Sequence, residues 1–224
     1  MRLDNFAAID KFIEEWNADT SNTSTVGHNF MSDWTSEEKK RLNGLAQAPK
    51  EISKDVPVFK ADANQSIPSS VNWFTAGAVT PVLNQGACGS CWAFSATSAL
   101  ASAQWLFQPR QAGETAPLLL SQQQLVSCSQ SFGNGGCGGG WYYWAWDYLQ
   151  TTPQVTSAQY PYSNAALNYG ITSKCNLSAA TGGIVYTNST TPYTAVGTTS
   201  LDILTAIAQQ PVSVAVEADQ PVFQ

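Results

Sequence analysis

Residues 84–94 read NQGACGSCWAF and place two cysteines, Cys88 and Cys91, three positions apart. This C-x-x-C spacing occurs in zinc sites, in redox dithiols, and where a structural cysteine precedes a reactive one. A zinc site usually takes four ligands, but the chain has one histidine, His28, and no second C-x-x-C. A thioredoxin-like dithiol usually lies in a βαβ pattern, whereas the segment before Cys88 is glycine-bounded and loop-like. The spacing therefore favours a structural cysteine beside a reactive one.

Cys91 is predicted to open a helix that runs to about Phe107, because the residues after it are mainly small or apolar. The N–H groups and the dipole at a helix N terminus stabilise a thiolate, which is the nucleophile that acyl transfer requires. Gln85 precedes Cys91 by six residues, and its side-chain amide can donate a hydrogen bond to a developing oxyanion. The stretch therefore combines a candidate nucleophile with a candidate oxyanion donor.

These residues resemble the active-site segment of papain-like cysteine peptidases of the cathepsin L type, whose signature C-G-[SA]-C-[WY] matches residues 88–92 in full. Residues 68–73 are similar to the mature N terminus of that family, residues 136–140 to its glycine-rich substrate loop, and residues 160–162 to its Tyr-Pro-Tyr segment. The resemblance implies an α+β, papain-like two-domain fold. A helical left domain and the start of a β-barrel-like right domain would follow a helical prosegment.

The resemblance also implies roles for individual residues. Cys91 would be the catalytic nucleophile and Gln85 the oxyanion donor. A glycine pair would present its backbone to an extended substrate, because a side chain there would obstruct the approach. Further residues would line the substrate pocket. Together with the glycine pair, the expected substrate-binding positions are Gly139, Gly140, Trp141, Tyr142 and Ala215. Core packing is the competing interpretation for the aromatic run, and it is favoured for Trp144 and Trp146.

The five cysteines are an odd number, which leaves one thiol unpaired in an oxidised protein. Spacing alone allows three connectivities for four cysteines. The resemblance implies the pairs Cys88–Cys137 and Cys128–Cys175 and leaves Cys91 free. Disulfides require an oxidising compartment, so we expect the secretory pathway, with a lysosomal, vacuolar or extracellular destination. The first ten residues, MRLDNFAAID, lack the apolar core of a signal peptide.

Four Asn-x-Ser/Thr sequons are glycosylation candidates, and chance in a Ser/Thr-rich chain explains them equally well. They lie at Asn22, Asn64, Asn176 and Asn188. Together they weakly favour the same secretory route. Each needs an exposed side chain to be modified, so the structure can separate accessible sequons from inaccessible ones.

Charge divides the chain into two parts. Residues 1–65 hold 8 of the 10 Lys and Arg residues and 11 of the 16 Asp and Glu residues. An apolar repeat over residues 6–16 predicts one helix, and Thr35 with Glu38 forms a capping box before another. Short charged helices bury too little apolar area to be stable alone, so they need a partner surface. By resemblance, residues 1–65 are an inhibitory prosegment, incomplete at its N terminus, and residues 66–224 are a peptidase domain, incomplete at its C terminus.

The second part of the chain predicts further regular elements. Residues 118–126 form a mainly apolar run that reads as a helix, with Ser121 as a possible cap. Residues 201–218 predict a short helix followed by a strand. No internal repeat is visible. By resemblance, the first of these helices is the second helix of the family, and the elements of residues 201–218 belong to the opening of the right domain.

A cysteine peptidase needs a histidine that holds the thiolate and protonates the leaving amine. His28 is the only histidine, and its place in the prosegment favours a structural role. The family's catalytic histidine and asparagine follow the cysteine by about 130 to 150 residues. We therefore expect both to lie beyond Gln224 and the 224 residues to be an inactive zymogen fragment. The alternative is an inactive relative that serves as a binding or inhibitory module.

Composition excludes several other classes of function. The net charge of −6 argues against a nucleic-acid partner, and no apolar run approaches the roughly 18 residues of a membrane span. Seven charged residues in residues 66–224 leave little from which to build a glycosidase carboxylate pair. By resemblance, peptides or proteins would be the substrates and the prosegment would be an intramolecular inhibitor, and we expect a monomer without metal or cofactor.

Overall fold

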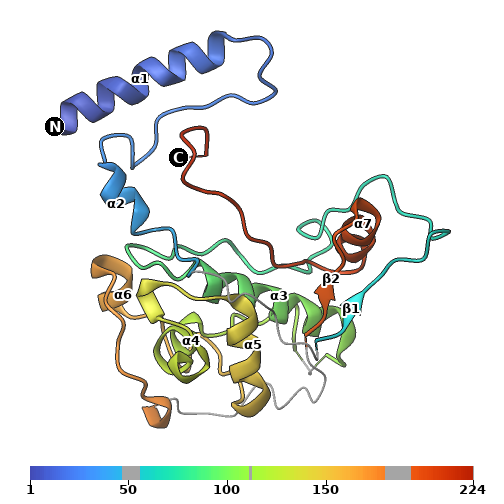
Figure 1. The fold of residues 1–224 in the computed structure, drawn as a ribbon. Helices are drawn as coiled ribbons and strands as arrows, with labels where there is room; N and C mark the ends of the chain where they lie inside the picture. The colour runs from blue at the N-terminus through green and yellow to red at the C-terminus, as the bar shows by residue number, and fades with distance from the viewer. Residues whose placement is uncertain (47–55, 111–112, 180–192, 224) are drawn as a thin grey trace. The chain divides into compact units, whose positions relative to one another are not determined.

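The computed structural model describes residues 1–46, 56–110, 113–179 and 193–223 (Figure 1). The chain divides into two compact units, one of Met1–Asn43 with Val216–Gln224 and the other of Gly44–Ala215. The first unit contains the predicted prosegment helices. The second contains the C-x-x-C segment and the hydrophobic core, and each unit is described by itself.

The first unit contains two helices, α1 (Arg2–Ala18) and α2 (Ser36–Lys40). α1 covers the predicted apolar repeat, and none of its residues is buried. The predicted capping box at the start of α2 is confirmed. The Thr35 hydroxyl accepts a hydrogen bond from the Glu38 N–H at 3.2 Å, and the Glu38 carboxylate accepts one from the Thr35 N–H at 2.8 Å.

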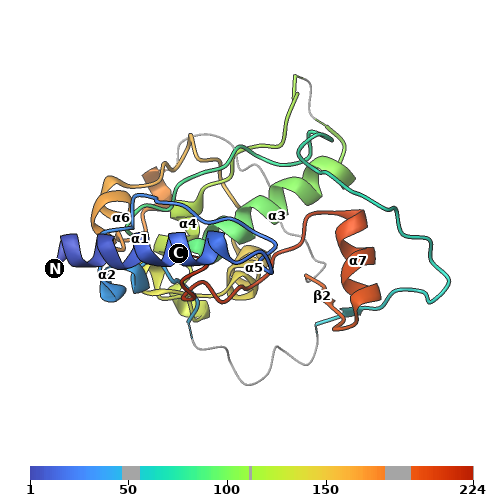
Figure 2. The same ribbon diagram turned by 90° about the horizontal axis from the view of Figure 1, so that it is seen from above.

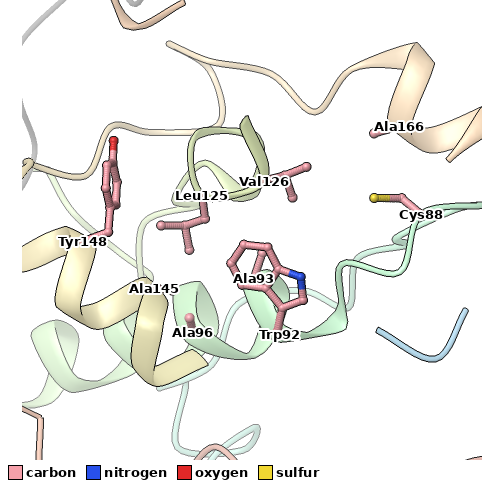
Figure 3. Close-up of a cluster of buried hydrophobic side chains, with 9 residues drawn as sticks. All are labelled: Cys88, Trp92, Ala93, Ala96, Leu125, Val126, Ala145, Tyr148 and Ala166. Carbon is pink, nitrogen blue, oxygen red and sulfur yellow. The ribbon is translucent and has the colours of Figure 1, made fainter. Parts of the chain in front are cut away.

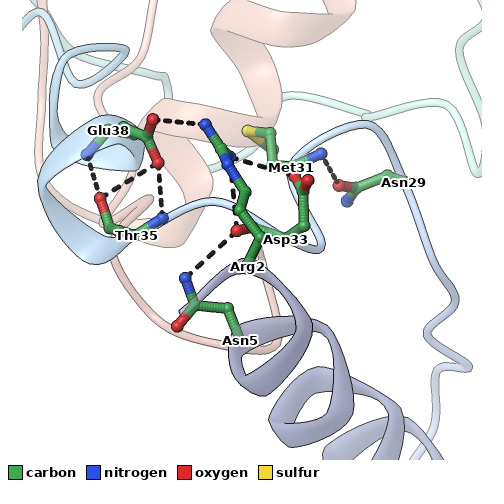
Figure 4. A network of polar contacts seen from close by, with 7 residues as sticks. All are labelled: Arg2, Asn5, Asn29, Met31, Asp33, Thr35 and Glu38. Atoms are coloured by element: carbon green, nitrogen blue, oxygen red, sulfur yellow. Dashed lines mark hydrogen bonds and ion pairs between the residues drawn. The ribbon is translucent and has the colours of Figure 1, made fainter.

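Arg2, on α1, contacts both α2 and the segment before it (Figure 4). Its guanidinium lies 2.7 Å from the Glu38 carboxylate and 3.3 Å from the Asp33 carboxylate. The Asn5 amide donates to the Asp33 carbonyl oxygen at 3.1 Å. The Thr35 N–H is the main cause that holds the pKa of Glu38 below its usual value. Because solvent screens exposed ion pairs, this network orients α1 more than it stabilises it.

The second unit is mainly helical. Its helices are α3 (Cys91–Phe107), α4 (Gln122–Cys128), α5 (Tyr142–Thr151), α6 (Asn164–Tyr169) and α7 (Ser200–Gln209), with short 3-10 turns η1 (Gln130–Phe132), η2 (Gly136–Gly138) and η3 (Leu177–Ala179). The predicted start of α3 at Cys91 is confirmed. α4 starts after the predicted residue 118, because the Ser121 hydroxyl caps it by accepting from the Gln124 N–H at 3.0 Å. Figures 1 and 2 place α6 and α7 on opposite sides of α3.

The hydrophobic core lies where α4 and α5 pack against α3 (Figure 3). Trp92, the second residue of α3, is 1 % exposed and fills the space that the small side chains around it leave. The buried cluster consists of Cys88, Trp92, Ala93, Ala96, Leu125, Val126, Ala145, Tyr148 and Ala166. Because close-packed cores resist displacement, this cluster fixes the first turn of α3, which carries Cys91.

Two short strands of the second unit join the predicted prosegment range to the C-terminal part of the chain. β1 (Val58–Phe59) pairs in parallel with β2 (Ala195–Val196), and α7 follows β2. The predicted helix in residues 201–218 is confirmed, but the predicted strand after it is wrong, since residues 211–217 are irregular. A strand needs a hydrogen-bonded neighbour, and residues 211–217 join no ladder within the described parts of the chain.

Candidate active site

Cys91 is the first residue of α3, and Ser90 is its N-cap residue. The Cys91 thiol is half-buried and takes part in no disulfide. The other four cysteines form the two pairs that the resemblance implies, Cys88–Cys137 and Cys128–Cys175. The first pair ties the loop before the nucleophile to the glycine-rich turn η2. The two loops that the resemblance assigns to the site are therefore covalently joined.

Gln85 lies on the loop that leads into α3. Its side-chain amide donates a hydrogen bond to the Cys88 carbonyl oxygen at 2.8 Å, which holds the side chain over the C-x-x-C turn. The side chain is half-buried, and its hydrogen bond to Cys88 constrains its orientation. This placement is compatible with an oxyanion donor, a role that stays a prediction.

The backbone of Gly140 forms an edge, called the glycine edge here, that pairs with residues 44–46. The Gly140 N–H donates to the Gly44 carbonyl oxygen at 2.9 Å, and the Gly140 carbonyl oxygen accepts from the Ala46 N–H at 3.5 Å. Gly139 has a φ of +115°, which L side chains rarely adopt. A Cβ on Gly140 would lie 2.2 Å from the Asn134 side-chain oxygen. Both positions therefore require glycine, and the Gly140 backbone can bind an extended chain.

Gly44 lies directly against the candidate nucleophile. A Cβ on Gly44 would lie 2.1 Å from the Gly89 carbonyl oxygen and 3.0 Å from the Cys91 sulfur. The Trp141 indole N–H donates to the carbonyl oxygen of Ala46 at 2.8 Å, which holds the end of the same segment. Residues 44–46 thus cover Cys91 and occupy the glycine edge. A second extended chain cannot pair with that edge while this segment is bound.

The predicted pocket residues are only partly brought together. Trp141 and Tyr142 lie side by side with ring centroids 5.8 Å apart, and burial raises the pKa of Tyr142. Trp146 packs against the core, and its indole N–H donates to the Ala96 carbonyl oxygen at 3.4 Å, as core packing predicts. Ala215 is exposed on the irregular segment after α7, and its grouping with the aromatic pair stays a prediction.

His28 lies in the first unit and has partners there. Its Nε2 atom is 3.1 Å from the Asp10 carboxylate, and its ring stacks on Phe6 with centroids 4.3 Å apart. These contacts fit the structural role that its sequence position favours. The imidazole joins two parts of the predicted prosegment, α1 and the loop that follows it.

The sequons differ in accessibility. Asn64 and Asn176 are exposed, so both remain glycosylation candidates. The Asn22 side chain is half-buried, and its amide donates to the Trp16 carbonyl oxygen at 2.9 Å, which makes it a poorer acceptor. Asn188 lies outside the described residues.

Two residues to which the sequence interpretation gave no role in the active site take part in it. Asn134 is 3 % exposed, and its side-chain oxygen accepts from the Trp141 N–H at 2.8 Å. It fixes the turn from the glycine pair into α5. Gly44 covers Cys91. A polar residue inside a glycine-rich run was the available signal for Asn134. Gly44 was interpreted as the stop of the helix after Thr35, which is wrong because α2 ends at Lys40 with Arg41 as its C-cap.

Comparison with known proteins places this site in a family. The profile described as "Papain family cysteine protease" matches residues 67–224. This chain belongs to the papain family. Among curated relatives, Cysteine proteinase 6 of Dictyostelium discoideum is 35 % identical over an alignment that covers 100 % of this chain and 48 % of that protein. Cathepsin S of Rattus norvegicus is 41 % identical over 62 % of this chain and 40 % of that protein. The chain therefore spans about half the length, or less, of such papain-family relatives.

Solved structures of papain-family proteins share the fold. A recombinant stem bromelain precursor superposes with a TM-score of 0.76 at 27 % identity and covers 98 % of this chain and 66 % of its own. A digestive procathepsin L 3 from the larval midgut of Tenebrio molitor superposes with a TM-score of 0.62 at 26 % identity, over 87 % of this chain and 56 % of its own. The α+β, papain-like architecture, with its helical left domain, is thereby confirmed. In the described ranges, every helix is too short or too polar to cross a bilayer.

Proposed function

We propose that the full-length protein containing these residues is a cysteine-type peptidase that cleaves peptide bonds in peptides or proteins. One observation carries the proposal: the unpaired thiol of Cys91 lies under a segment that is already paired, as an extended chain, with the Gly140 edge. The thiolate would attack the scissile carbonyl carbon and form a thioester as the C–N bond breaks. Gln85 would donate to the oxyanion, and water would then release the acid and restore the thiol.

The general base of this reaction is proposed to come from outside the 224 residues. The amine leaves with a proton, and a histidine usually supplies it. His28 has structural partners in Asp10 and Phe6, and the chain spans 48 % of the Dictyostelium relative. We expect the full-length protein to contribute a histidine, oriented by an asparagine. The 224 residues by themselves are then a zymogen fragment without activity.

Residues 1–65 are proposed to act as an inhibitory prosegment for a peptidase domain over residues 66–224. Support comes from Gly44, which packs on Cys91, and from the two backbone hydrogen bonds of residues 44–46 to Gly140. A substrate would need the same backbone groups, so prosegment and substrate exclude each other. The pro-forms among the structural relatives are compatible with this assignment.

A secretory destination is proposed for the full-length protein, in a lysosome, a vacuole or the extracellular space. The two disulfides Cys88–Cys137 and Cys128–Cys175 persist only where the environment is oxidising. Two exposed sequons, Asn64 and Asn176, fit the same route. We propose a monomer, which needs no cofactor for the chemistry described above.

Turnover of a fluorogenic peptide tests the proposed function. After residues 1–65 are removed, the full-length protein is expected to cleave the peptide with kcat/KM of at least about 10⁴ M⁻¹s⁻¹, as peptidases commonly do. The 224-residue chain is expected to show no turnover, because it lacks the proton donor. Absence of turnover by the correctly folded full-length protein would instead favour a binding or inhibitory module.

Release of the prosegment is expected to increase as the pH falls, because protonation of Asp202 weakens its attachment. This carboxylate is 4 % exposed, accepts from the Ala61 N–H at 2.8 Å and lies 3.7 Å from the Lys60 ammonium. The Ala61 N–H is the main cause that lowers the pKa of Asp202 from 3.8, and the Thr199 hydroxyl adds to it. A lowered folded-state pKa means that the attachment is intact above 3.8 and weakens as pH falls below that value.

Hydrogen exchange of the Ala61 amide measures this attachment. Its protection is expected to be lower at about pH 3 than at about pH 6, after correction for intrinsic exchange rates. Asp202→Asn should remove most of that pH dependence, whereas Asp219→Asn, at an exposed carboxylate, should leave it intact. Equal protection at both pH values in the wild type would contradict the prediction.

A further inference from the structure

The Tyr162 hydroxyl lies between the two segments that carry the proposed catalytic groups. It is 2.7 Å from the Ser90 hydroxyl and 3.0 Å from the Gln85 carbonyl oxygen. Ser90 is fully buried and immediately precedes Cys91 at the start of α3. One phenol oxygen therefore joins the residue before the nucleophile to the residue that would supply the oxyanion donor.

The direction of these two hydrogen bonds follows from the groups involved. A carbonyl oxygen can only accept, so the Tyr162 proton must be donated to Gln85. Tyr162 has one O–H, so the Ser90 hydroxyl must be the donor in the other bond. Burial raises the pKa of Tyr162, which keeps the phenol neutral and able to donate. The result is a directed chain from Ser90 through Tyr162 to Gln85.

The middle of this chain, Tyr162, and its Ser90 end are themselves fixed. The Tyr162 ring meets the Phe94 ring edge to face, with centroids 5.2 Å apart, and Phe94 lies on the first turn of α3. The Ser90 carbonyl oxygen accepts from the Ala93 N–H at 2.8 Å, and the Ser90 N–H donates to the Cys88 carbonyl oxygen at 2.8 Å. Tyr162 therefore cannot shift without moving either the loop of Gln85 or the start of α3.

We propose that Tyr162 is a positioning residue that fixes the separation of the Cys91 thiol and the Gln85 amide; this inference rests on the proposed peptidase function. The thiol attacks the carbonyl carbon while the Gln85 amide donates a hydrogen bond to the oxygen of the same carbonyl group. The thiol and the amide must therefore be held at a fixed separation. A displacement of about 1 Å between such groups can lower a rate by about 100-fold. Because the oxyanion exists only after attack, the loss falls on kcat and not on KM.

Tyr162→Phe tests the proposal in the full-length, activated protein, because it removes the hydroxyl and keeps the ring that packs on Phe94. We expect kcat for a fluorogenic peptide to fall by about tenfold and KM to change by less than about twofold. The matched control is Tyr160→Phe. Tyr160 belongs to the same Tyr-Pro-Tyr segment, but its hydroxyl accepts from the exposed Asn176 N–H at 3.2 Å, and the variant should keep the wild-type kcat.

Ser90→Ala breaks the same chain from its other end and should lower kcat by a similar factor. The double variant with Tyr162→Phe is expected to lose about as much kcat as either single variant. The two losses should not multiply, because both substitutions break the same hydrogen-bond chain. If the two losses multiply, or if Tyr162→Phe keeps kcat within about twofold of Tyr160→Phe, the positioning role is overturned. Thermal unfolding of each variant shows whether it is folded. If Tyr162→Phe is not folded, Ser90→Ala serves as the test variant in its place.

Failure of the proposed function has a different signature. In that case the wild type and Tyr160→Phe would both lack turnover. The positioning of Cys91 is then judged by the rate at which iodoacetamide alkylates it after removal of residues 1–65. We expect Tyr162→Phe to change that rate by at least about threefold relative to Tyr160→Phe, since the start of α3 shifts. Equal rates in the two variants would overturn the positioning role independently of turnover.

Discussion

Replacing Cys91 with alanine is expected to lower kcat/KM of the activated full-length protein for a peptide by at least about 1,000-fold. The thiol is the only unpaired cysteine of the chain, and it opens α3 next to the packed Trp92. Without it no thioester can form, and the remaining oxyanion and backbone contacts supply only weak catalysis. Steady-state hydrolysis of a fluorogenic peptide measures the loss.

Two controls accompany this substitution. The melting temperature should change little, because Cys91 is half-buried and the removed sulfur makes no disulfide. Tyr160→Phe, at a residue that the activated protein keeps, should leave kcat/KM within about twofold of the wild type. Undiminished hydrolysis by Cys91→Ala would show that another group performs the chemistry.

Gly44→Leu is expected to free the active site of the uncleaved, full-length protein at neutral pH. The new Cβ would lie 2.1 Å from the Gly89 carbonyl oxygen, a backbone atom that cannot move aside cheaply, and 3.0 Å from the Cys91 sulfur. The segment would lose its two hydrogen bonds to Gly140, at about 0.5–1.5 kcal/mol each, and would add the cost of the clash. Alkylation of Cys91 by iodoacetamide should become about 30- to 100-fold faster.

The chain offers a matched control for this variant. Gly27 lies in the same proposed prosegment, is exposed, and a Cβ on it would meet nothing within 4 Å. Gly27→Leu should therefore leave the alkylation rate of Cys91 at the wild-type value. If Gly44→Leu behaves like Gly27→Leu while both variants unfold at the wild-type temperature, residues 44–46 do not guard the nucleophile.

The local part of this structure could be read from the sequence. The start of α3 at Cys91, the cap at Thr35 and the cap at Ser121 depend on residues a few positions apart, so short patterns reveal them. The family signature supplied the two disulfide pairs, which spacing alone left open. The glycine pair at residues 139–140 was also visible, because positive φ and close backbone approach both select glycine.

The remaining features depend on contacts between distant segments. The pairing of residues 44–46 with Gly140 is made by backbone atoms, so no side-chain pattern predicts it. The Tyr162 bridge joins residues 72 and 77 positions away. The strand predicted at residues 211–218 failed because an alternating pattern gives a tendency only, and a ladder partner has to complete it. Local chemistry is thus encoded in short motifs, whereas the contacts that cover Cys91 depend on the tertiary fold.

Mass spectrometry of the full-length protein, freed of residues 1–65 and treated with a peptide that carries a thiol-reactive group, tests the central claim most directly. The account predicts one adduct per chain, located on Cys91 by peptide mapping. After removal of residues 1–65, the peptide reagent should react at least about 100-fold faster than the same reactive group without its peptide, because the glycine edge binds an extended chain. An adduct on another residue, or equal rates for the two reagents, would contradict the account.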